Sequence, residues 1–248
     1  MKIVLLPGMD GTGNLFSPLL QALSEFECEV ISLPQSGSQD YASLTMYVKG
    51  KLPDSDFILV AESFSGPIGA GLAKEGVKNM KGIIFVATFL SAPSKFLIAM
   101  ARALPLKFLS SLPLAKLFYK ALFLGSGASN ELTSMFQYTL QSLPPELIKA
   151  RLSSMYSLEF KLGSFEFPAG YIQAVSDRLV PSEKTIEFSG SFKNLIVRTI
   201  DGPHFILQAK PVQCAVAITE LTYLLTSQGS WTASLPAIRS VRSVREIS

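Results

Sequence analysis

Short apolar segments alternate along this chain with stretches of helical periodicity, and this alternation limits the fold more than any other feature of the sequence. Strand–helix–strand patterns are typical of a parallel sheet with helices on both faces. The strands of such a sheet are buried on both faces, so they appear as apolar runs without polar–apolar alternation. The sequence therefore predicts an α/β fold. The predicted strands are residues 2–6, 28–33, 56–61, 82–87, 169–175 and 195–199, and the predicted helices are residues 15–24, 44–51, 65–75 and 212–226.

The alternation stops between residues 92 and 163. Apolar helical stretches interrupted by several prolines replace it, and no strand pattern occurs there. We interpret residues 92–163 as a helical cap inserted after the fourth strand, and residues 1–91 and 164–227 as the core. Residues 228–248 contain three arginines and few apolar side chains. They are predicted to form a C-terminal tail, to which we assign no function.

The first part of this cap is basic. Its charged residues between positions 95 and 120 are Lys95, Arg102, Lys107, Lys116 and Lys120, with no acid among them. One interpretation is a cap whose lysines are simply solvated. The other is that the basic segment, which is rich in Phe and Leu, receives lipid-like acyl chains or contacts an anionic membrane surface. The sequence leaves both interpretations open, and it leaves the oligomeric state open as well.

Composition excludes several classes of function. A net charge of +3 is too small to indicate nucleic-acid binding by itself. Two cysteines, Cys28 and Cys214, do not make a disulfide framework, so a reducing cytoplasm is expected. One histidine and two distant cysteines offer little for a transition-metal site, and no metal or cofactor is expected. No apolar run is long enough for a transmembrane helix, and no signal-peptide pattern is present.

Ser63 lies in Ala61-Glu62-Ser63-Phe64-Ser65-Gly66, between a predicted strand and a predicted helix. A turn that projects a serine from the carboxyl end of a strand is sharp, and it needs small residues two positions before and after the serine, as in G-x-S-x-G. Ala61 and Ser65 occupy those positions here, so the motif departs from the consensus but stays small. The pattern indicates a nucleophile, and the alternative for Ser63 is a helix N-cap.

A glycine-rich loop, Pro7-Gly8-Met9-Asp10-Gly11-Thr12-Gly13, follows the first predicted strand. Its glycine spacing differs from G-x-G-x-x-G, and no acid follows the second strand, which disfavours a dinucleotide site. A phosphate-binding loop would need Gly-Lys-Ser/Thr, which is absent. The remaining use is to turn backbone N–H groups toward an oxyanion. We expect the donors to be the N–H groups of Met9 and Phe64.

His204 is the single histidine of the chain, and it follows the last predicted strand. The carboxyl ends of parallel strands share one edge of a sheet, so His204 and Ser63 are expected on the same edge. Histidine is the side chain whose ordinary pKa lies near neutrality, which makes His204 the candidate general base. The alternative is a histidine that only structures its loop.

Asp177 follows the fifth predicted strand, and one helix and one strand separate it from His204. A carboxylate there would hold the imidazole in the correct tautomer and stabilise the imidazolium. Three other acids compete for this role. Asp201 is too near His204 in the same loop, Asp10 lies on the glycine-rich loop, and the Glu62 side chain should point away from Ser63.

The chain order Ser63, Asp177, His204 resembles that of the α/β-hydrolase family, and the resemblance extends to about residue 226. Four segments carry it: residues 8–13, 61–66, 177–181 and 202–205. Two departures matter. The family usually begins with two further antiparallel strands, so we expect six parallel strands here with the second at an edge. The oxyanion loop usually starts His-Gly, and Pro7-Gly8 removes a side chain that often fixes the loop.

The resemblance implies hydrolysis of a small-molecule carboxylic ester of small to medium acyl chain through an acyl-enzyme. Ser63 would attack, His204 would take its proton, and the N–H groups of Met9 and Phe64 would hold the oxyanion. A serine nucleophile disfavours the dehalogenases of this fold, which use an aspartate. An acyl-thioesterase, acyltransferase or lysophospholipase with the same triad is an alternative. A hydrolase-like ligand-binding protein without catalysis is the alternative from another class.

Overall fold

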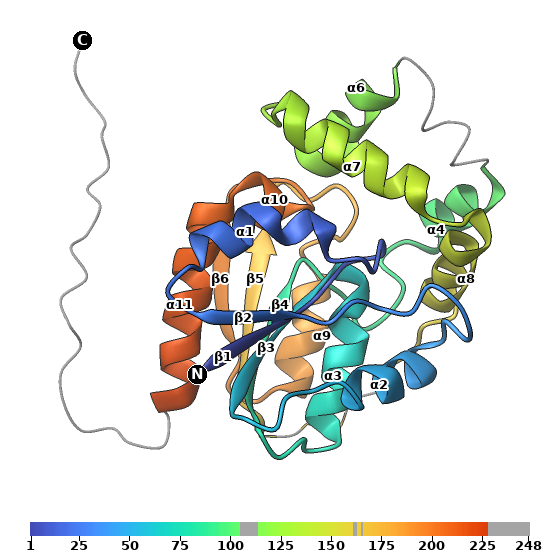
Figure 1. The fold of residues 1–248 in the computed structure, drawn as a ribbon. Helices are drawn as coiled ribbons and strands as arrows, with labels where there is room; N and C mark the ends of the chain where they lie inside the picture. Colours follow the sequence, from blue (N-terminus) through green and yellow to red (C-terminus); the bar gives the residue numbers. More distant parts are fainter. Residues whose placement is uncertain (105–113, 161–162, 165, 228–248) are drawn as a thin grey trace, which may run out of the picture.

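The computed structural model describes residues 1–104, 114–160, 163–164 and 166–227. The predicted tail and Lys107 lie outside the described residues. A six-stranded parallel sheet of strand order β2-β1-β3-β4-β5-β6 forms the centre of the molecule (Figure 1). The predicted fold class and the edge position of the second strand are thereby confirmed. The strands are β1 (Lys2–Leu6), β2 (Glu27–Val30), β3 (Phe57–Glu62), β4 (Met80–Val86), β5 (Ala169–Ala174) and β6 (Ile196–Ile200).

Strand β3 shows why the predicted strands lack polar–apolar alternation. Every residue of β3 is buried, and successive side chains enter opposite faces of the sheet. Leu59 and Ala61 belong to the core cluster on one face. Ile58 and Val60 belong to the cluster on the other face. Each strand of this kind supplies apolar side chains to two cores, so a continuous apolar run is what the fold requires.

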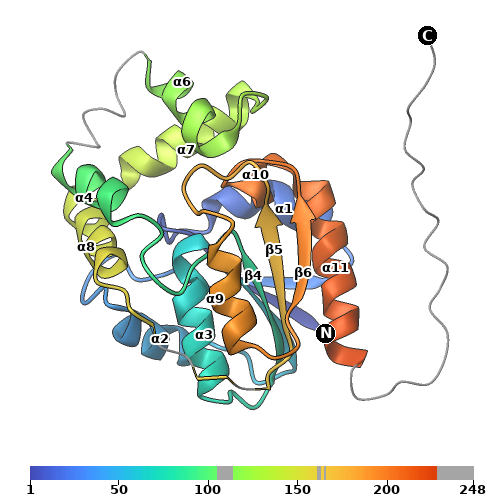
Figure 2. The ribbon, with the colours of Figure 1, turned by 180° about the vertical axis from the view of Figure 1, so that it is seen from behind.

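Helices cover both faces of the sheet (Figure 2). The helices α1 (Ser17–Ala22) and α11 (Pro211–Ser227) pack together on one face. The opposite face carries α2 (Tyr41–Lys49), α3 (Gly66–Lys74) and α9 (Lys184–Ser191). Short helical turns occur at η1 (Asn14–Phe16), η2 (Ser63–Ser65) and α10 (Ile206–Ala209). Among the residues that the structure describes, no helix is long and apolar enough to cross a bilayer.

The described part of the segment between β4 and β5 is helical, and its helices gather around the end of the sheet toward which the β5 arrow points (Figures 1 and 2). Its two ends meet at the core, where Ser91 bridges Glu159 and the Phe160 N–H donates to the Leu90 carbonyl at 3.1 Å. Its described elements are α4 (Lys95–Ala103), α6 (Ala115–Tyr119), a π-helical turn η3 (Lys120–Leu124), α7 (Asn130–Ser142) and α8 (Pro145–Tyr156).

An aromatic cluster fixes this helical segment to the loop that carries His204. Phe123 and Phe136 contact the ring of Phe205, with ring centroids 6.0 and 5.0 Å apart. The Phe205 N–H also donates to the Phe123 carbonyl at 3.1 Å. Since Phe205 directly follows His204, the packing of the helical segment supports the candidate base.

Candidate active site

Ser63 lies where β3 ends, with φ at +46°. A non-glycine residue in this left-handed region costs on the order of 1–3 kcal/mol, and such strain is concentrated at functional sites. The surrounding packing maintains the turn. A Cβ on Gly66 would overlap the side chain of Thr88, and the Thr88 hydroxyl donates to the Ser63 carbonyl. Thr88 therefore requires a small residue at position 66, in addition to the small residue that the turn itself requires at position 65.

The Ser63 hydroxyl pairs with the imidazole and does not cap a helix. Ser63 Oγ lies 2.9 Å from His204 Nε2. The capping positions of η2 and α3 are Glu62 and Ser65, and neither side chain makes a capping hydrogen bond. The N-cap interpretation of Ser63 is thus not supported, and the hydroxyl is positioned to give its proton to His204.

Asp177 fixes the other side of the imidazole. Its Oδ2 lies 2.7 Å from His204 Nδ1, and its Oδ1 accepts the N–H groups of Leu179 and Val180 at 2.8 and 2.9 Å. A carboxylate at Nδ1 favours the tautomer with the proton on Nδ1, so Nε2 is the acceptor that faces Ser63. The His204 and Asp177 side chains are only 5% and 4% exposed, so little water competes for these bonds.

The competing acids have other partners. Asp201 is exposed, and its Oδ1 accepts the Ser176 hydroxyl at 3.0 Å. Asp10 Oδ2 accepts the N–H and the hydroxyl of Thr12 at 2.9 and 2.6 Å, which rigidifies the glycine-rich loop. Neither acid is hydrogen-bonded to His204 in the structure.

Glu62 is buried, and Gln208 Nε2 donates to its Oε1 at 3.0 Å. Burial raises the pKa of the Glu62 carboxyl to about 7, and the hydrogen bond from Gln208 opposes this increase only partly. Glu62 and Gln208 form a polar pair beneath the nucleophile turn that the sequence did not predict. A glutamate beside a serine gives no signal of such burial in the sequence.

The glycine-rich loop lies against the nucleophile turn. A Cβ on Gly8 would lie 3.7 Å from Ser63 Cβ, and the Ser65 hydroxyl donates to the Pro7 carbonyl. The Gly11 N–H donates to the Gly8 carbonyl at 3.0 Å, which closes a turn in which Gly11 has a φ of +69°. Because a trans peptide points its N–H opposite to its C=O, the N–H of Met9 points away from this turn. Phe64 follows Ser63 directly, and Gly8, whose peptide carries the Met9 N–H, lies against Ser63.

Arg151 on α8 is a further residue of this region that was not predicted from the sequence. Its side chain is fully buried, and its guanidinium donates to the Met9 carbonyl at 2.8 Å and the Pro34 carbonyl at 2.9 Å. Its Nε donates to Gln39 Oε1 at 3.0 Å. Burial lowers the pKa of Arg151 to about 10, and nearby Asp10 opposes the decrease, so the group remains charged at neutral pH. In the sequence, Arg151 is an ordinary cation within a helical pattern.

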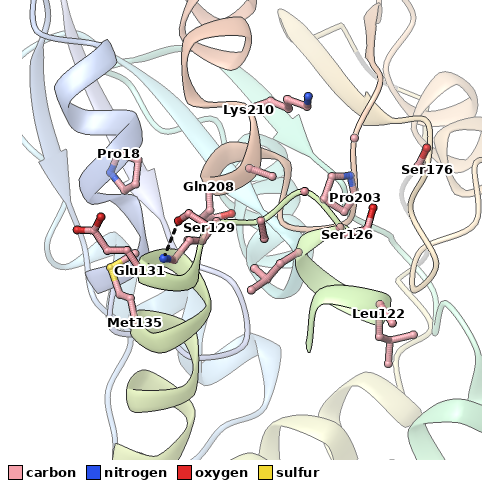
Figure 3. A pocket seen from close by; sticks show the side chains of 18 of the residues that line it. Pro18, Leu122, Ser126, Ser129, Glu131, Met135, Ser176, Pro203, Gln208 and Lys210 are labelled. Atoms are coloured by element: carbon pink, nitrogen blue, oxygen red, sulfur yellow. Dashed lines mark hydrogen bonds between the residues drawn. The ribbon is translucent and has the colours of Figure 1, made fainter. Parts of the chain in front are cut away.

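A cavity of about 950 Å³ lies between the cap and the core (Figure 3). Its lining includes Ser129 and Met135 from the cap and Pro203 and Gln208 from the core. None of the three predicted triad residues lines it. Pro203 precedes His204, and Gln208 donates a hydrogen bond to Glu62, which precedes Ser63. The cavity is therefore lined by neighbours of the predicted triad residues.

Metal chemistry has no centre in the part of the chain that the structure describes. No group of three or more His, Cys, Asp and Glu residues there is placed to hold an ion. Cys28 and Cys214 are free thiols, and burial raises the pKa of both. The arrangement around Ser63 offers a hydroxyl, an imidazole and a carboxylate in series.

Known structures with this architecture are numerous, although their sequences have diverged. The chain is similar to an esterase from Exiguobacterium antarcticum (TM-score 0.74, 13% identity, 90% of this chain and 92% of that one). It is also similar to the enol-lactonase from Burkholderia xenovorans LB400 (TM-score 0.71, 15% identity, 90% of this chain and 91% of that one). A third similar structure is the RedJ thioesterase of the prodiginine pathway in Streptomyces coelicolor (TM-score 0.63, 16% identity, 91% of this chain and 84% of that one).

No protein-family model and no curated protein sequence matches this chain. The structural similarity covers both the core and the helical segment, and it shows that the chain has the α/β-hydrolase fold. The resemblance that the four sequence segments predicted is confirmed at the level of the fold.

Proposed function

We propose that this protein is a serine hydrolase that cleaves carboxylic esters of small to medium acyl chains through an acyl-enzyme. The observation that carries the proposal is the continuous series Ser63 Oγ, His204 Nε2, His204 Nδ1 and Asp177 Oδ2, with separations of 2.9 and 2.7 Å. Such a series activates a hydroxyl that is otherwise a weak nucleophile.

In the acylation step, Ser63 Oγ forms a bond to the ester carbonyl carbon while its proton moves to His204 Nε2. The carbonyl oxygen becomes an oxyanion, which the N–H groups of Met9 and Phe64 stabilise. Collapse of this intermediate breaks the bond to the alkoxy oxygen, and the alcohol leaves with the proton from His204. Asp177 stays ionised and stabilises the imidazolium while it exists.

In the deacylation step, His204 takes a proton from a water molecule whose oxygen attacks the acyl carbon. The bond to Ser63 Oγ then breaks, and the proton on Nε2 returns to Ser63. The acid is released and the enzyme is regenerated without a metal or an organic cofactor.

Hydrolysis of nitrophenyl esters tests this proposal. We expect turnover of the acetate and the butyrate, and a loss of kcat on the order of 10⁴–10⁶-fold in Ser63→Ala. Ser191→Ala is the matched control, because Ser191 is also a buried serine but bonds only within α9, to the Glu187 carbonyl at 3.0 Å. A folded wild-type protein without turnover would favour the non-catalytic ligand-binding class.

A second candidate function is hydrolysis or transfer of longer acyl chains, as in an acyl-thioesterase, an acyltransferase or a lysophospholipase. Exposed apolar side chains on α4 and at α6 favour it, with Phe96 72%, Leu114 73% and Leu117 67% exposed. Lys116 and Lys120 donate to the neutral side chains of Ser134 and Asn130, so these hydrogen bonds leave their charge unneutralised. Apolar side chains beside uncompensated cations suit an anionic lipid surface.

Two measurements distinguish this candidate from the first. Long-chain substrates such as the palmitate should be preferred over the butyrate, and the protein should bind vesicles that contain phosphatidylglycerol but not vesicles of phosphatidylcholine alone. Phe96→Ser should weaken vesicle binding. Met46→Ser on α2 is the control, because Met46 is 72% exposed as well. Short-chain preference together with no vesicle binding would exclude the membrane contact.

A further inference from the structure

Arg151 is a buried cation whose polar contacts lie outside its own helix. A buried charge is costly unless its donors are satisfied, and removal of its partners is strongly destabilising. The Arg151 guanidinium donates one hydrogen bond to the loop after β1, at Met9, and two to the segment after β2, at Pro34 and Gln39. Helix α8 of the cap thereby reaches two core loops, and the first of them, the glycine-rich loop, lies against the nucleophile turn.

The contact with the first of these loops is close. The guanidinium lies directly against Gly11, where any Cβ would overlap it, and Gly11 itself has a φ of +69°. Arg151 Cζ also lies 5.9 Å from the centre of the Phe64 ring. The side chain thus contacts both residues whose N–H groups form the proposed oxyanion site, Met9 through its carbonyl and Phe64 through its ring.

We propose that Arg151 is a positioning residue that holds the glycine-rich loop in the conformation that binds the oxyanion, so that the seating of the cap and the formation of the oxyanion site are coupled. This inference rests on the proposed ester hydrolysis. Arg151 contacts no reacting atom, and its effect passes through the main chain of Met9.

The main-chain geometry explains the effect. The Gly8–Met9 peptide is oriented at its carbonyl end by the Gly11 N–H, and the next peptide is oriented at the Met9 carbonyl by Arg151. Because the carbonyls of Gly8 and Met9 are both held, the torsion angles of Met9 are restrained. The direction of the Met9 N–H is therefore set before a substrate arrives. Preorganised donors of this kind need no rearrangement during the reaction.

Hydrogen bonds to the glycine-rich loop explain how it can begin with Pro7-Gly8 in place of the usual His-Gly. The side chain expected to fix the loop is missing from the loop itself, and Arg151 from the cap, Asp10 from the loop and Ser65 from the nucleophile turn provide bonds instead. Of these three, only Arg151 comes from outside the core.

Arg151→Met tests the proposal, because methionine keeps an apolar stem of similar reach and removes every donor. Lys149→Met is the matched control, since Lys149 is an exposed cation on the same helix. We expect Arg151→Met to lower kcat by on the order of 10²-fold with KM changed only a few-fold, as for the loss of one oxyanion donor. Arg151→Lys, which can still donate to one carbonyl, should recover part of the loss.

Comparison of an ester with its thionoester distinguishes the positioning role of Arg151 from a role in stability alone. Sulfur is a poor acceptor for oxyanion donors, so the wild type should strongly prefer the ester, and this preference should shrink in Arg151→Met. An unchanged ester-to-thionoester ratio would overturn the proposal, even if the variant were less active or less stable.

Hydrogen exchange provides a readout that needs no turnover. Peptides that cover Met9 and Gly11 should exchange faster in Arg151→Met than in the wild type, while peptides from β3 and β5 should be unchanged. Equal exchange in the glycine-rich loop would contradict the positioning role whatever the substrate. A wild type without ester turnover but with faster loop exchange in Arg151→Met would reject the hydrolase function and leave the loop contact established.

Discussion

Both ring nitrogens of His204 are engaged, which sets the direction in which a proton can move. Asp177 accepts at Nδ1, and Ser63 faces Nε2. Two backbone N–H groups hold the second carboxylate oxygen of Asp177, so this carboxylate is fixed before it orients the imidazole. Asp201 precedes His204 by three positions, but its side chain turns to Ser176 instead. The acid next to His204 in space is thus the one farther away in sequence.

Replacement of the two aspartates should therefore have very different effects. In Asp177→Asn the amide can donate a hydrogen bond to Nδ1, which favours the tautomer with the proton on Nε2 and blocks proton uptake from Ser63. We expect kcat for ester hydrolysis to fall by about 10⁴-fold. Asp201→Asn should remain within a few-fold of the wild type. A variant series in which Asp201→Asn is the inactive one would show that the wrong acid has been chosen.

At the scale of elements, the chemistry is placed by the ends of strands. The three predicted triad residues follow β3, β5 and β6, whose carboxyl ends share one edge of the sheet, so the topology brings them together without detailed knowledge of packing. This is why Ser63, Asp177 and His204 could be predicted from the sequence. Arg151 could not, because its contacts depend on how α8 docks, which the order of the strands does not determine. Glu62 and Gln208 escaped prediction because nothing in the sequence around either residue indicates a buried polar side chain.

The nucleophile turn depends on the close approach of Gly66 to Thr88. In Gly66→Ala the new methyl group would overlap the Thr88 side chain, which also holds the Ser63 carbonyl. We expect a loss of about 1–3 kcal/mol in the free energy of unfolding, together with a large loss of kcat. Gly190→Ala in α9 is the control, because no atom lies near its Cβ and alanine favours the helix. Urea unfolding and ester kinetics measure both effects, and equal behaviour of the two variants would refute this account of the turn.

For the whole molecule, the sheet and its flanking helices were predictable because each depends on local periodicity. The first strand was found where it was predicted, and other boundaries moved by up to three residues, as for the second strand, predicted at residues 28–33 and found at Glu27–Val30. The path of the cap was not predictable, because its helices lack a sheet to align them and are positioned by contacts such as Phe136 with Phe205. Pocket shape follows from that path, so the cavity between cap and core had no signature in the sequence.

Stability of the whole fold should depend on pH through Glu62. Its pKa is raised from the ordinary value of 4.5 to about 7 by burial. The raised value stabilises the folded protein fully below about pH 4.5, and this contribution is lost as pH rises toward 7, because the unfolded chain releases the proton first. The loss is on the order of 3 kcal/mol.

Glu62→Gln cannot ionise, so its stability relative to the wild type should increase between pH 4.5 and 7 and then level off. Urea unfolding across this pH range measures the free energy of unfolding of both proteins. Parallel curves of this free energy against pH would contradict a buried, protonated Glu62.

The central claim is that Ser63 is an activated nucleophile, and covalent labelling with a fluorophosphonate followed by peptide mapping tests it most directly. The reagent reacts with an activated serine and needs no knowledge of the natural substrate. We predict a single adduct on Ser63, fast in the wild type, much slower in Asp177→Asn and absent in Ser63→Ala. A folded protein that gives no adduct, or an adduct at another residue, would contradict the account.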